Sequence, residues 1–151
     1  MSGRDAVGAL LSDFGRVIGI PDLEFDAANR CVLLLDEGMV VTIELDEADE
    51  RLLLYTPLGE PTGDPPAAYA ELLRANYLGG QSGGGMLGLQ PDGQAITLSQ
   101  WVPTPGLDAT RFSNALERFV NAADDWRERL PRLGASATND GADAPMRAIR
   151  G

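Results

Sequence analysis

The residues best suited to chemistry form one dense cluster of carboxylates between positions 44 and 50. Paired carboxylates can serve as general acid and base in a hydrolase when they face each other across a cleft. A calcium loop instead needs oxygen ligands at alternate positions around a central glycine, and this stretch has neither. We therefore interpret the cluster as a solvated turn and keep a small carboxylate-dependent hydrolase as an alternative. The acids are Glu44, Asp46, Glu47, Asp49 and Glu50.

Several other kinds of active site are excluded by the residue types that the sequence lacks. It has no histidine and no lysine, so neither a Ser-His-Asp nor a Cys-His site can be assembled. The single cysteine, Cys31, lies in an apolar run, where we expect a small buried core residue and no zinc site. The glycine-rich run Gly79–Gly85 lacks the lysine of a phosphate-binding loop. We expect no catalytic residue, no metal and no cofactor.

The length and charge of the chain limit the kinds of partner that it can bind. It has 151 residues and a formal net charge of −11. This length suits one domain with its own core, and the acid excess argues against nucleic acid and anionic membrane surfaces. No apolar run approaches the ~18 residues of a membrane span, and the first residues do not resemble a signal peptide. These features predict a cytoplasmic protein without membrane insertion.

Hydrophobic periodicity predicts an α+β domain with the order α-β-β-β-α-β-β-α and an antiparallel sheet packed by helices. The expected helices cover residues 4–18, 65–78 and 109–130, and the expected strands residues 30–35, 39–45, 51–58, 86–90 and 95–102. The run Gly79–Gly85 is expected to be a flexible connector. We expect a single domain over residues 1–130 and a disordered tail over residues 131–151.

The strands contain more apolar residues than a sheet covered by helices on one face can bury. The strands at 30–35 and 51–58 are apolar on both faces, so the uncovered face still carries Val32, Leu34, Leu53 and Tyr55. An exposed apolar area above a few hundred Å² usually marks a partner surface. We therefore expect a second copy of the chain, an extended ligand polypeptide, or both to cover this face.

Four phrases of the sequence occur in the order and spacing of one protein family. They are Leu10–Gly15 running into Ile18–Leu23, Leu72–Tyr77, Gly88–Gly93 followed by Ile96–Leu98, and Phe112–Val120 with Trp126. On these phrases, which span most of residues 7–130, the chain resembles the small acidic type III secretion chaperones of the Tir chaperone (CesT-like, class I) family.

The resemblance implies a bacterial cytoplasmic homodimer without enzymatic activity or cofactor. Such chaperones hold the N-terminal chaperone-binding segment of a secreted effector in extended form, soluble and competent for export, and the secretion ATPase is a further candidate partner. The second helix and neighbouring strand would build the dimer interface from Leu72, Leu73, Asn76, Tyr77, Met86 and Leu87. The first helix and the sheet would bind the effector through Leu10, Phe14, Val17, Val32, Leu34, Leu53 and Tyr55.

A function from the regulatory class stays open beside the chaperone. A partner-switching protein with the same fold would sequester a regulator of secretion gene expression instead of an exported client. Co-purification distinguishes the two, because recovery of only a transcription regulator or anti-activator would favour the switch.

Overall fold

A computed structural model describes residues 3–135 of the chain and shows an α+β fold with the expected order of elements. Three short 3₁₀ turns join or follow the longer elements, at Asp36–Gly38, Tyr77–Gly79 and Leu130–Arg132. The helices are α1 (Gly3–Ile18), α2 (Pro65–Asn76) and α3 (Ala109–Arg129). The strands are β1 (Arg30–Leu34), β2 (Val40–Asp46), β3 (Arg51–Gly59), β4 (Met86–Leu89) and β5 (Ile96–Pro103).

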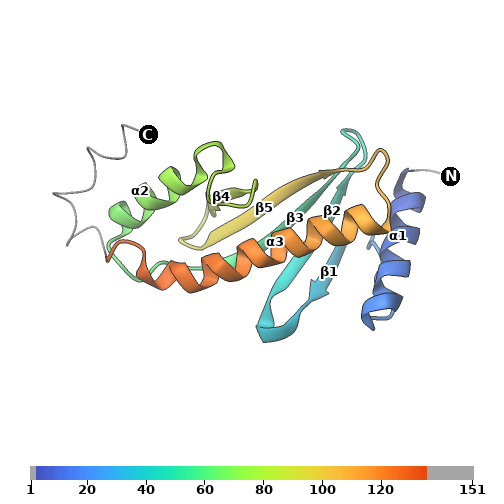
Figure 1. The fold of residues 1–151 in the computed structure, drawn as a ribbon, viewed down its shortest axis with the longest axis horizontal. Coiled ribbons are helices and arrows are strands. Elements are labelled where there is room, and N and C mark those ends of the chain that lie inside the picture. Colours follow the sequence, from blue (N-terminus) through green and yellow to red (C-terminus); the bar gives the residue numbers. More distant parts are fainter. Residues whose placement is uncertain (1–2, 136–151) are drawn as a thin grey trace.

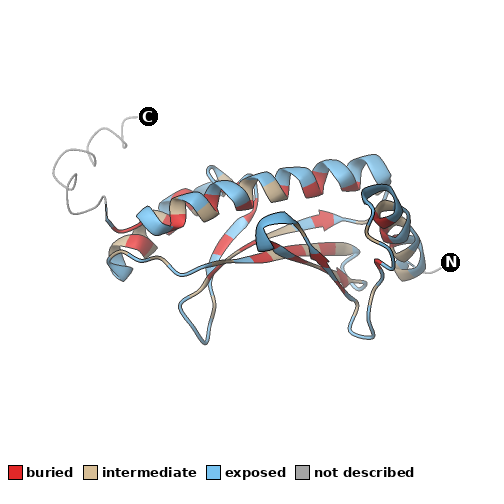
Figure 2. Ribbon diagram, turned by 90° about the horizontal axis from the view of Figure 1, so that it is seen from below, coloured by how far each residue is buried: buried red, intermediate tan, exposed pale blue. Residues whose placement is uncertain are grey.

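The strands form one antiparallel sheet in the order β1-β2-β3-β5-β4. The long helix α3 runs across one face of this sheet (Figure 1). At its two ends lie the other helices, α1 beside the N-terminal end of α3 and α2 beside its C-terminal end. Within residues 3–135, no helix covers the opposite face of the sheet (Figure 2). The antiparallel sheet and its packing by helices were therefore predicted correctly.

Strand residues alternate between the core and the face opposite α3. In β1, Cys31 and Leu33 are buried while Arg30, Val32 and Leu34 are exposed. The same alternation continues in β2 and β3. Because full burial of one large apolar side chain contributes roughly 1.5–3 kcal/mol, these inward residues determine which face α3 covers. The largest fully buried side chains are Trp126, Phe112, Phe119, Leu11, Leu33, Ile43, Leu52, Leu54, Ile96 and Leu98.

Carboxylate caps begin two of the helices at the expected positions. The Asp64 side chain accepts a hydrogen bond from the Ala67 N–H at the start of α2. The Asp108 side chain accepts one from the Arg111 N–H at the start of α3. Such caps satisfy N–H groups that have no partner within the helix.

The glycine-rich run between α2 and β4 is a packed loop, not the flexible connector expected from its composition. The indole N–H of Trp126 in α3 donates to the carbonyl of Gln81 at 2.8 Å. Ser82 is buried, and its hydroxyl donates to the carbonyl of Gly85 at 2.6 Å. A Cβ at Gly85 would lie 2.6 Å from the Ser99 carbonyl, so this glycine allows the loop to approach β5.

Packing continues past residue 130 into the beginning of the expected tail. Leu133 and Gly134 are buried, and the Gly134 N–H donates to Glu71 of α2 at 3.2 Å. A Cβ at Gly63 would lie 2.2 Å from the Leu133 carbonyl, so only glycine fits at that point of contact. The rest of the expected tail, residues 136–151, lies outside the described residues.

Candidate protein-binding surfaces

The face of the sheet opposite α3 carries a group of solvent-accessible apolar side chains, which we name the open sheet face. Val32 and Leu34 of β1 are 60% and 67% exposed. These fractions are high for two apolar positions on the same side of one strand, and the described helices leave this face of the sheet uncovered (Figure 2). The open sheet face consists of Val32, Leu34, Val40, Leu53, Tyr55 and Trp101.

The register of the strands brings these side chains into rows. Val32 of β1 lies opposite Thr42, which in turn lies opposite Tyr55 of β3. Leu53 of β3 lies opposite Trp101 of β5. Directly opposite residues of an antiparallel pair point to the same face and pack together. The four strand residues expected on the uncovered face, Val32, Leu34, Leu53 and Tyr55, are therefore on one surface.

Trp101 is a member of this surface that sequence reasoning missed. β5 pairs with β4 through Ile96–Ser99 and with β3 on its other side, where Trp101 lies opposite Leu53. The alternation of Ile96, Leu98 and Val102 as buried residues was the available signal, because it directs Trp101 to the opposite face.

Arg51 connects Trp101 to the acidic cluster at the end of the open sheet face. Its guanidinium lies over the indole ring of Trp101, 3.6 Å from the ring centroid. The same group forms ion pairs with Asp46 at 3.2 Å and Asp49 at 3.1 Å. These two carboxylates thus hold an arginine in place, as expected of a polar strand end. The geometry gives no support to the carboxylate-dependent hydrolase.

Glu44 forms a second polar group, beside Tyr55. Its carboxylate accepts a hydrogen bond from the Tyr55 hydroxyl at 3.2 Å and pairs with Arg30 at 3.5 Å. Partial burial, followed by the negative charge of Glu44, raises the pKa of Tyr55 above its ordinary value. Tyr55 is therefore a neutral hydrogen-bond donor at neutral pH, and its ring remains part of the apolar surface.

The free edge of the sheet at β1 is open over a short length. The carbonyl of Asn29 accepts a hydrogen bond from the Leu45 N–H, so the odd-numbered residues of β1 bond to β2. The even-numbered residues Val32 and Leu34 therefore direct their N–H and C=O groups away from the sheet. These outward groups make no hydrogen bond to any of residues 3–135, so they can pair with another strand.

The same edge is closed one step earlier, at Arg30. The Arg30 N–H donates to the Asp26 carboxylate at 3.0 Å, and the Arg30 carbonyl accepts from the Asp26 N–H at 2.8 Å. The hydrogen bond from the Arg30 N–H is the largest cause that holds the pKa of Asp26 below its ordinary value. An added strand would therefore pair with Val32 and Leu34 but not with Arg30.

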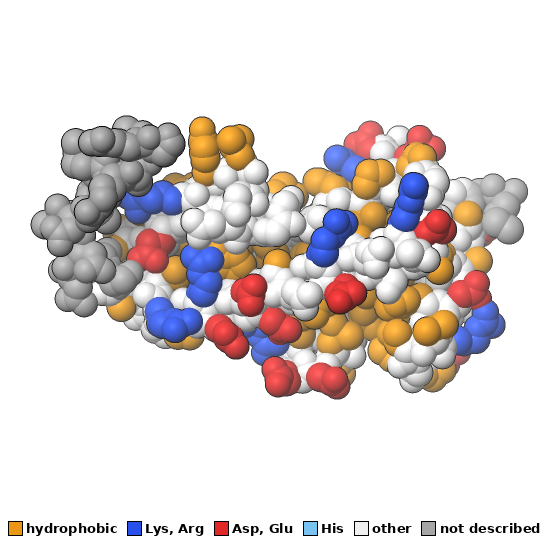
Figure 3. All heavy atoms as spheres, viewed as in Figure 1, with side chains coloured by type: hydrophobic (Ala, Val, Ile, Leu, Met, Phe, Trp, Pro, Cys, Tyr) orange, Lys and Arg blue, Asp and Glu red, His pale blue; other side chains and the backbone are white. Residues whose placement is uncertain are grey.

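The three α1 residues predicted to bind the effector lie on a different surface. Phe14 packs edge-on against Phe112 of α3, with ring centroids 5.1 Å apart, and Leu10 is partly buried. Val17 is 85% exposed. Phe14, Val17 and Ile18 border a groove between α1 and α3, where hydrophobic side chains gather (Figure 3). The predicted effector-binding residues are thus divided between two surfaces.

The α2 residues predicted for the dimer interface differ in exposure. Leu72 is buried together with Ala68 and Ala75, whereas Leu73 and Tyr77 are largely exposed. Leu72 and Leu73, as neighbours on a helix, point about 100° apart, so packing of α2 buries one and exposes the other. Leu73 and Tyr77 remain available to a partner, and Leu72 belongs to the core.

On β4, Met86 is exposed while Leu87 is buried. Asn76 at the end of α2 bonds to both outward backbone groups of Leu87. The Leu87 N–H donates to Asn76 Oδ1 at 2.9 Å, and Asn76 Nδ2 donates to the Leu87 carbonyl at 3.1 Å. Asn76 therefore occupies the β4 edge at this position, as another strand would.

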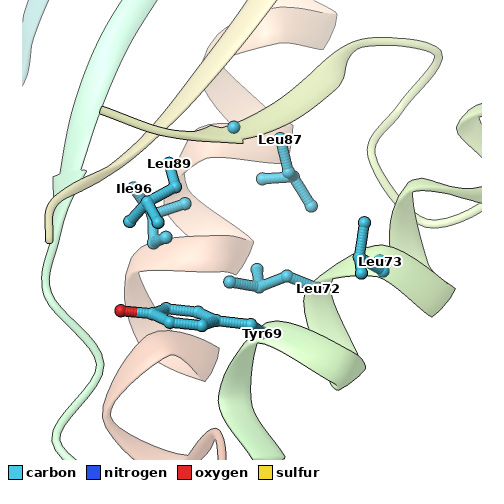
Figure 4. A pocket seen from close by; sticks show the side chains of 7 residues that line it. Tyr69, Leu72, Leu73, Leu87, Leu89 and Ile96 are labelled. Carbon is cyan, nitrogen blue, oxygen red and sulfur yellow. The ribbon is translucent and has the colours of Figure 1, made fainter. Parts of the chain in front are cut away.

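Between α2 and β4 lies an apolar cavity of about 230 Å³, which we name the α2–β4 pocket. Tyr69 and Leu72 of α2 face Leu89 and Ile96 of the strands across it (Figure 4). Leu73 lies at its border. The complete lining consists of Tyr69, Leu72, Leu73, Leu87, Gly88, Leu89 and Ile96.

Among residues 3–135, none of the helices combines the length and the hydrophobicity of a membrane span. These residues also contain no group of three or more Cys, Asp or Glu side chains placed to hold a metal ion.

Comparison with known proteins identifies the family. Residues 9–127, from α1 to α3, match the model of the Tir chaperone protein (CesT) family. The chain belongs to the CesT family. This CesT-family chain is 28% identical over 124 residues to a protein of Chlamydia pneumoniae, covering 80% of this chain and 93% of that protein. The resemblance found in the sequence is therefore confirmed.

Solved structures give the same result for this CesT-family chain. It is similar to the crystal structure of the ExsC–ExsE complex, with a TM-score of 0.77 and 25% identity, covering 87% of this chain and 98% of that chain. It is also similar to the HopA1–SchA chaperone–effector complex, with a TM-score of 0.62 and 26% identity, covering 83% and 92%. The residues matched by the family model, 9–127, contain every surface described above.

Proposed function

We propose that this chain is a type III secretion chaperone that acts as a homodimer in the bacterial cytoplasm. It holds the N-terminal chaperone-binding segment of a secreted effector in extended form and so keeps the effector soluble and export-competent. The observation that carries the proposal is the open sheet face beside an open β1 edge, in a chain of the CesT family. The similarity to a chaperone–effector complex supports it.

The β1 edge supplies the backbone part of client recognition. An extended client segment pairs with the outward N–H and C=O groups of Val32 and Leu34. Client residues opposite these two point to the open sheet face, where they contact apolar side chains. The hydrogen bonds of Asp26 to Arg30 end the pairing on one side.

Side-chain burial must compensate for ordering the client. Folding a disordered segment onto a surface costs about 2–5 kcal/mol, so one short edge is not sufficient. The open sheet face and the groove between α1 and α3, bordered by Phe14 and Val17, provide two apolar surfaces. With a net charge of −11 on the chain, a client segment with alternating apolar residues and basic flanks is favoured.

The homodimer uses the other end of the molecule. Leu72, Leu73 and Leu87 line the α2–β4 pocket. Tyr77 at the end of α2 and Met86 at the start of β4 are exposed, and Asn76 joins α2 to β4 through Leu87. A two-fold contact there leaves the β1 edge of each copy free for the client. All these surfaces lie within residues 1–130, which we propose to be a single chaperone domain.

The test is a client-binding measurement on the double variant Val32→Asp/Leu34→Asp. Two charges on the open sheet face oppose burial of apolar client side chains, so we expect the affinity to fall by at least about tenfold, or 1.4 kcal/mol. The ligand is the N-terminal segment of the secreted effector encoded beside the gene, titrated by calorimetry. The double variant Gln94→Asp/Asn121→Asp, at two exposed positions outside the open sheet face, is the charge-matched control.

Circular dichroism establishes that the variants are folded. Unchanged affinity in a folded double variant would show that the open sheet face does not bind the client. Co-purification of the wild-type chain with a transcription regulator alone, and with no exported protein, would favour the regulatory alternative instead.

A further inference from the structure

Leu78 is a bulky apolar residue held in an unfavourable conformation and directed into solvent. Its φ of 54° is in the left-handed region, and its side chain is 87% exposed. Helices normally place glycine at such a position after their last turn, because a Cβ is unfavourable there. In a single copy of the chain, no burial offsets this unfavourable backbone conformation.

Hydrogen bonds on both sides fix the turn that presents Leu78. The Gly80 N–H donates to the Tyr77 carbonyl at 3.0 Å, and the Gln81 N–H donates to the Ala75 carbonyl at 3.1 Å. The Gln81 carbonyl is held in turn by Trp126 of α3. The turn is therefore positioned by the rest of the fold, and hydrophobic side chains project from the end of α2 (Figure 3).

The α2–β4 pocket lies on the same end of the molecule. Leu73 of α2 lies at the border of the pocket, five positions before Leu78 in the sequence. Tyr69 and Leu89 face each other across the pocket (Figure 4). A two-fold axis passing between Leu78 and the pocket places Leu78 of each copy against the pocket of the other copy.

The distribution of charge along the chain favours a second copy of the chain as the occupant of the α2–β4 pocket. The 17 consecutive residues from Ala75 to Pro91 carry no charge, in a chain whose net charge is −11. Two strongly acidic copies can approach most closely where neither carries charge. A basic client gains no electrostatic attraction at this end and is attracted instead to the acid-flanked open sheet face.

The exposed apolar area is of the size that such a contact requires. Five side chains with exposed fractions between 41% and 87% together provide several hundred Å² on each copy, a large part of the roughly 800 Å² per partner in a stable interface. The five are Leu73, Tyr77, Leu78, Met86 and Leu89.

We propose that Leu78 of each copy inserts into the α2–β4 pocket of the other. The pocket is thus completed by a residue of the second copy, and the unfavourable conformation of Leu78 is compensated by its burial in the dimer. This inference rests on the homodimer of the proposed function and assigns its central contact.

The first test is the variant Leu78→Gly, which should stabilise the monomer and weaken the dimer. Glycine relieves the left-handed backbone, so the monomer should be at least as stable as wild type. Because a two-fold dimer contains two inserted Leu78 side chains, their loss should raise the dimer dissociation constant by at least about 100-fold, measured by sedimentation equilibrium over a dilution series. Val17→Gly, which removes an equally exposed side chain elsewhere, is the control and should leave dimerisation unchanged.

The second test detects the contact between Leu78 of one copy and Tyr69 in the pocket of the other. Leu78→Cys and Tyr69→Cys are made as separate proteins, each with Cys31→Ser, and mixed in equal amounts under mild oxidation. A disulfide between them can form only across two copies, and we expect it to be the major product. A mixture of Leu78→Cys with Val17→Cys is the control and should give little of this product.

The outcomes separate the inference from the proposed function. A wild-type dimer that is unaffected by Leu78→Gly and gives no 69–78 disulfide would overturn the insertion of Leu78 alone. A wild-type chain that stays monomeric at every concentration would overturn both the homodimer and the insertion. Client binding through Val32 and Leu34 is measured independently of either result.

Discussion

Cys31 illustrates how one residue's chemistry follows from its place in a strand. It alternates with the exposed residues Arg30 and Val32, so its thiol points into the core under α3. Burial, followed by the negative charge of Asp26, raises the pKa of this thiol to about 11 from an ordinary value of 9.0. The expectation of an inert core cysteine therefore agrees with its surroundings.

We predict that iodoacetamide alkylates Cys31 at pH 8 at least about 100-fold more slowly in the folded chain than in urea. Two pKa units reduce the thiolate fraction by this factor, and burial slows the reaction further. The rate is followed by mass spectrometry, with Cys31→Ser as the blank. An alkylation rate equal to that of the unfolded chain would contradict the burial.

The raised pKa of the Cys31 thiol makes the free energy of unfolding depend on pH. A raised thiol pKa means that the folded state favours the protonated form, so the stability that Cys31 contributes is fully present below about pH 9. It is lost as the pH rises through 9 towards 11. The variant Cys31→Ala should lack this part of the alkaline loss of stability.

At the scale of elements, the two edges of the sheet differ. At β4 the outward groups of Leu87 are bonded to Asn76, whereas at β1 those of Val32 and Leu34 are free among the described residues. An open edge accepts a strand and a closed edge does not. The difference directs an extended client to β1 and leaves the α2–β4 end for contacts between side chains.

The position of α2 relative to β4 depends on the glycine-rich loop, and that loop depends on Trp126. We predict that Trp126→Phe, which removes the N–H donated to Gln81, lowers the unfolding free energy by about 1 kcal/mol. The melting temperature should fall by about 2–4 °C, and amide hydrogen exchange should increase over residues 79–85.

Trp101→Phe is the matched control, because Trp101 lies on the open sheet face and not against this loop. Exchange over residues 79–85 that is unchanged by Trp126→Phe would show that the loop is held by other contacts, such as those of Ser82.

At the scale of the whole molecule, the chain separates two kinds of apolar surface. One lies on the sheet beside acidic and basic side chains, and the other lies around the uncharged α2–β4 end. A strongly acidic chain repels its own copies except where charge is absent, so the second surface suits self-association. The surface on the sheet suits a polypeptide of opposite charge.

We predict that the melting temperature rises with protein concentration, because unfolding is coupled to dissociation in a dimer. Each tenfold increase should add about 1.4 kcal/mol of apparent stability per mole of dimer. Scanning calorimetry over a 100-fold range measures this. Leu73→Glu should remove the dependence without unfolding the chain, whereas Leu72→Glu would place a charge in the core. A wild-type melting temperature independent of concentration would argue against a dimer.

The sequence by itself determined the kinds of elements, the burial of Cys31 and the uncovered position of Val32 and Leu34. Periodicities of 2 and 3.6 residues are local properties, readable wherever one side of an element is buried. The family was also identifiable, because its four phrases are short and continuous. The exclusion of histidine and lysine chemistry required only the composition.

Tertiary structure alone decided which of these residues meet. Leu53 and Trp101 are 48 positions apart and are neighbours only because β5 pairs with β3. The glycine-rich loop is ordered by Trp126, which no local pattern predicts. The rotation of α2, which buries Leu72 and exposes Leu73, is set by packing against β4. Contacts between distant segments depend on the strand order and on the summed packing of the core, and neither is encoded in a single short stretch of sequence.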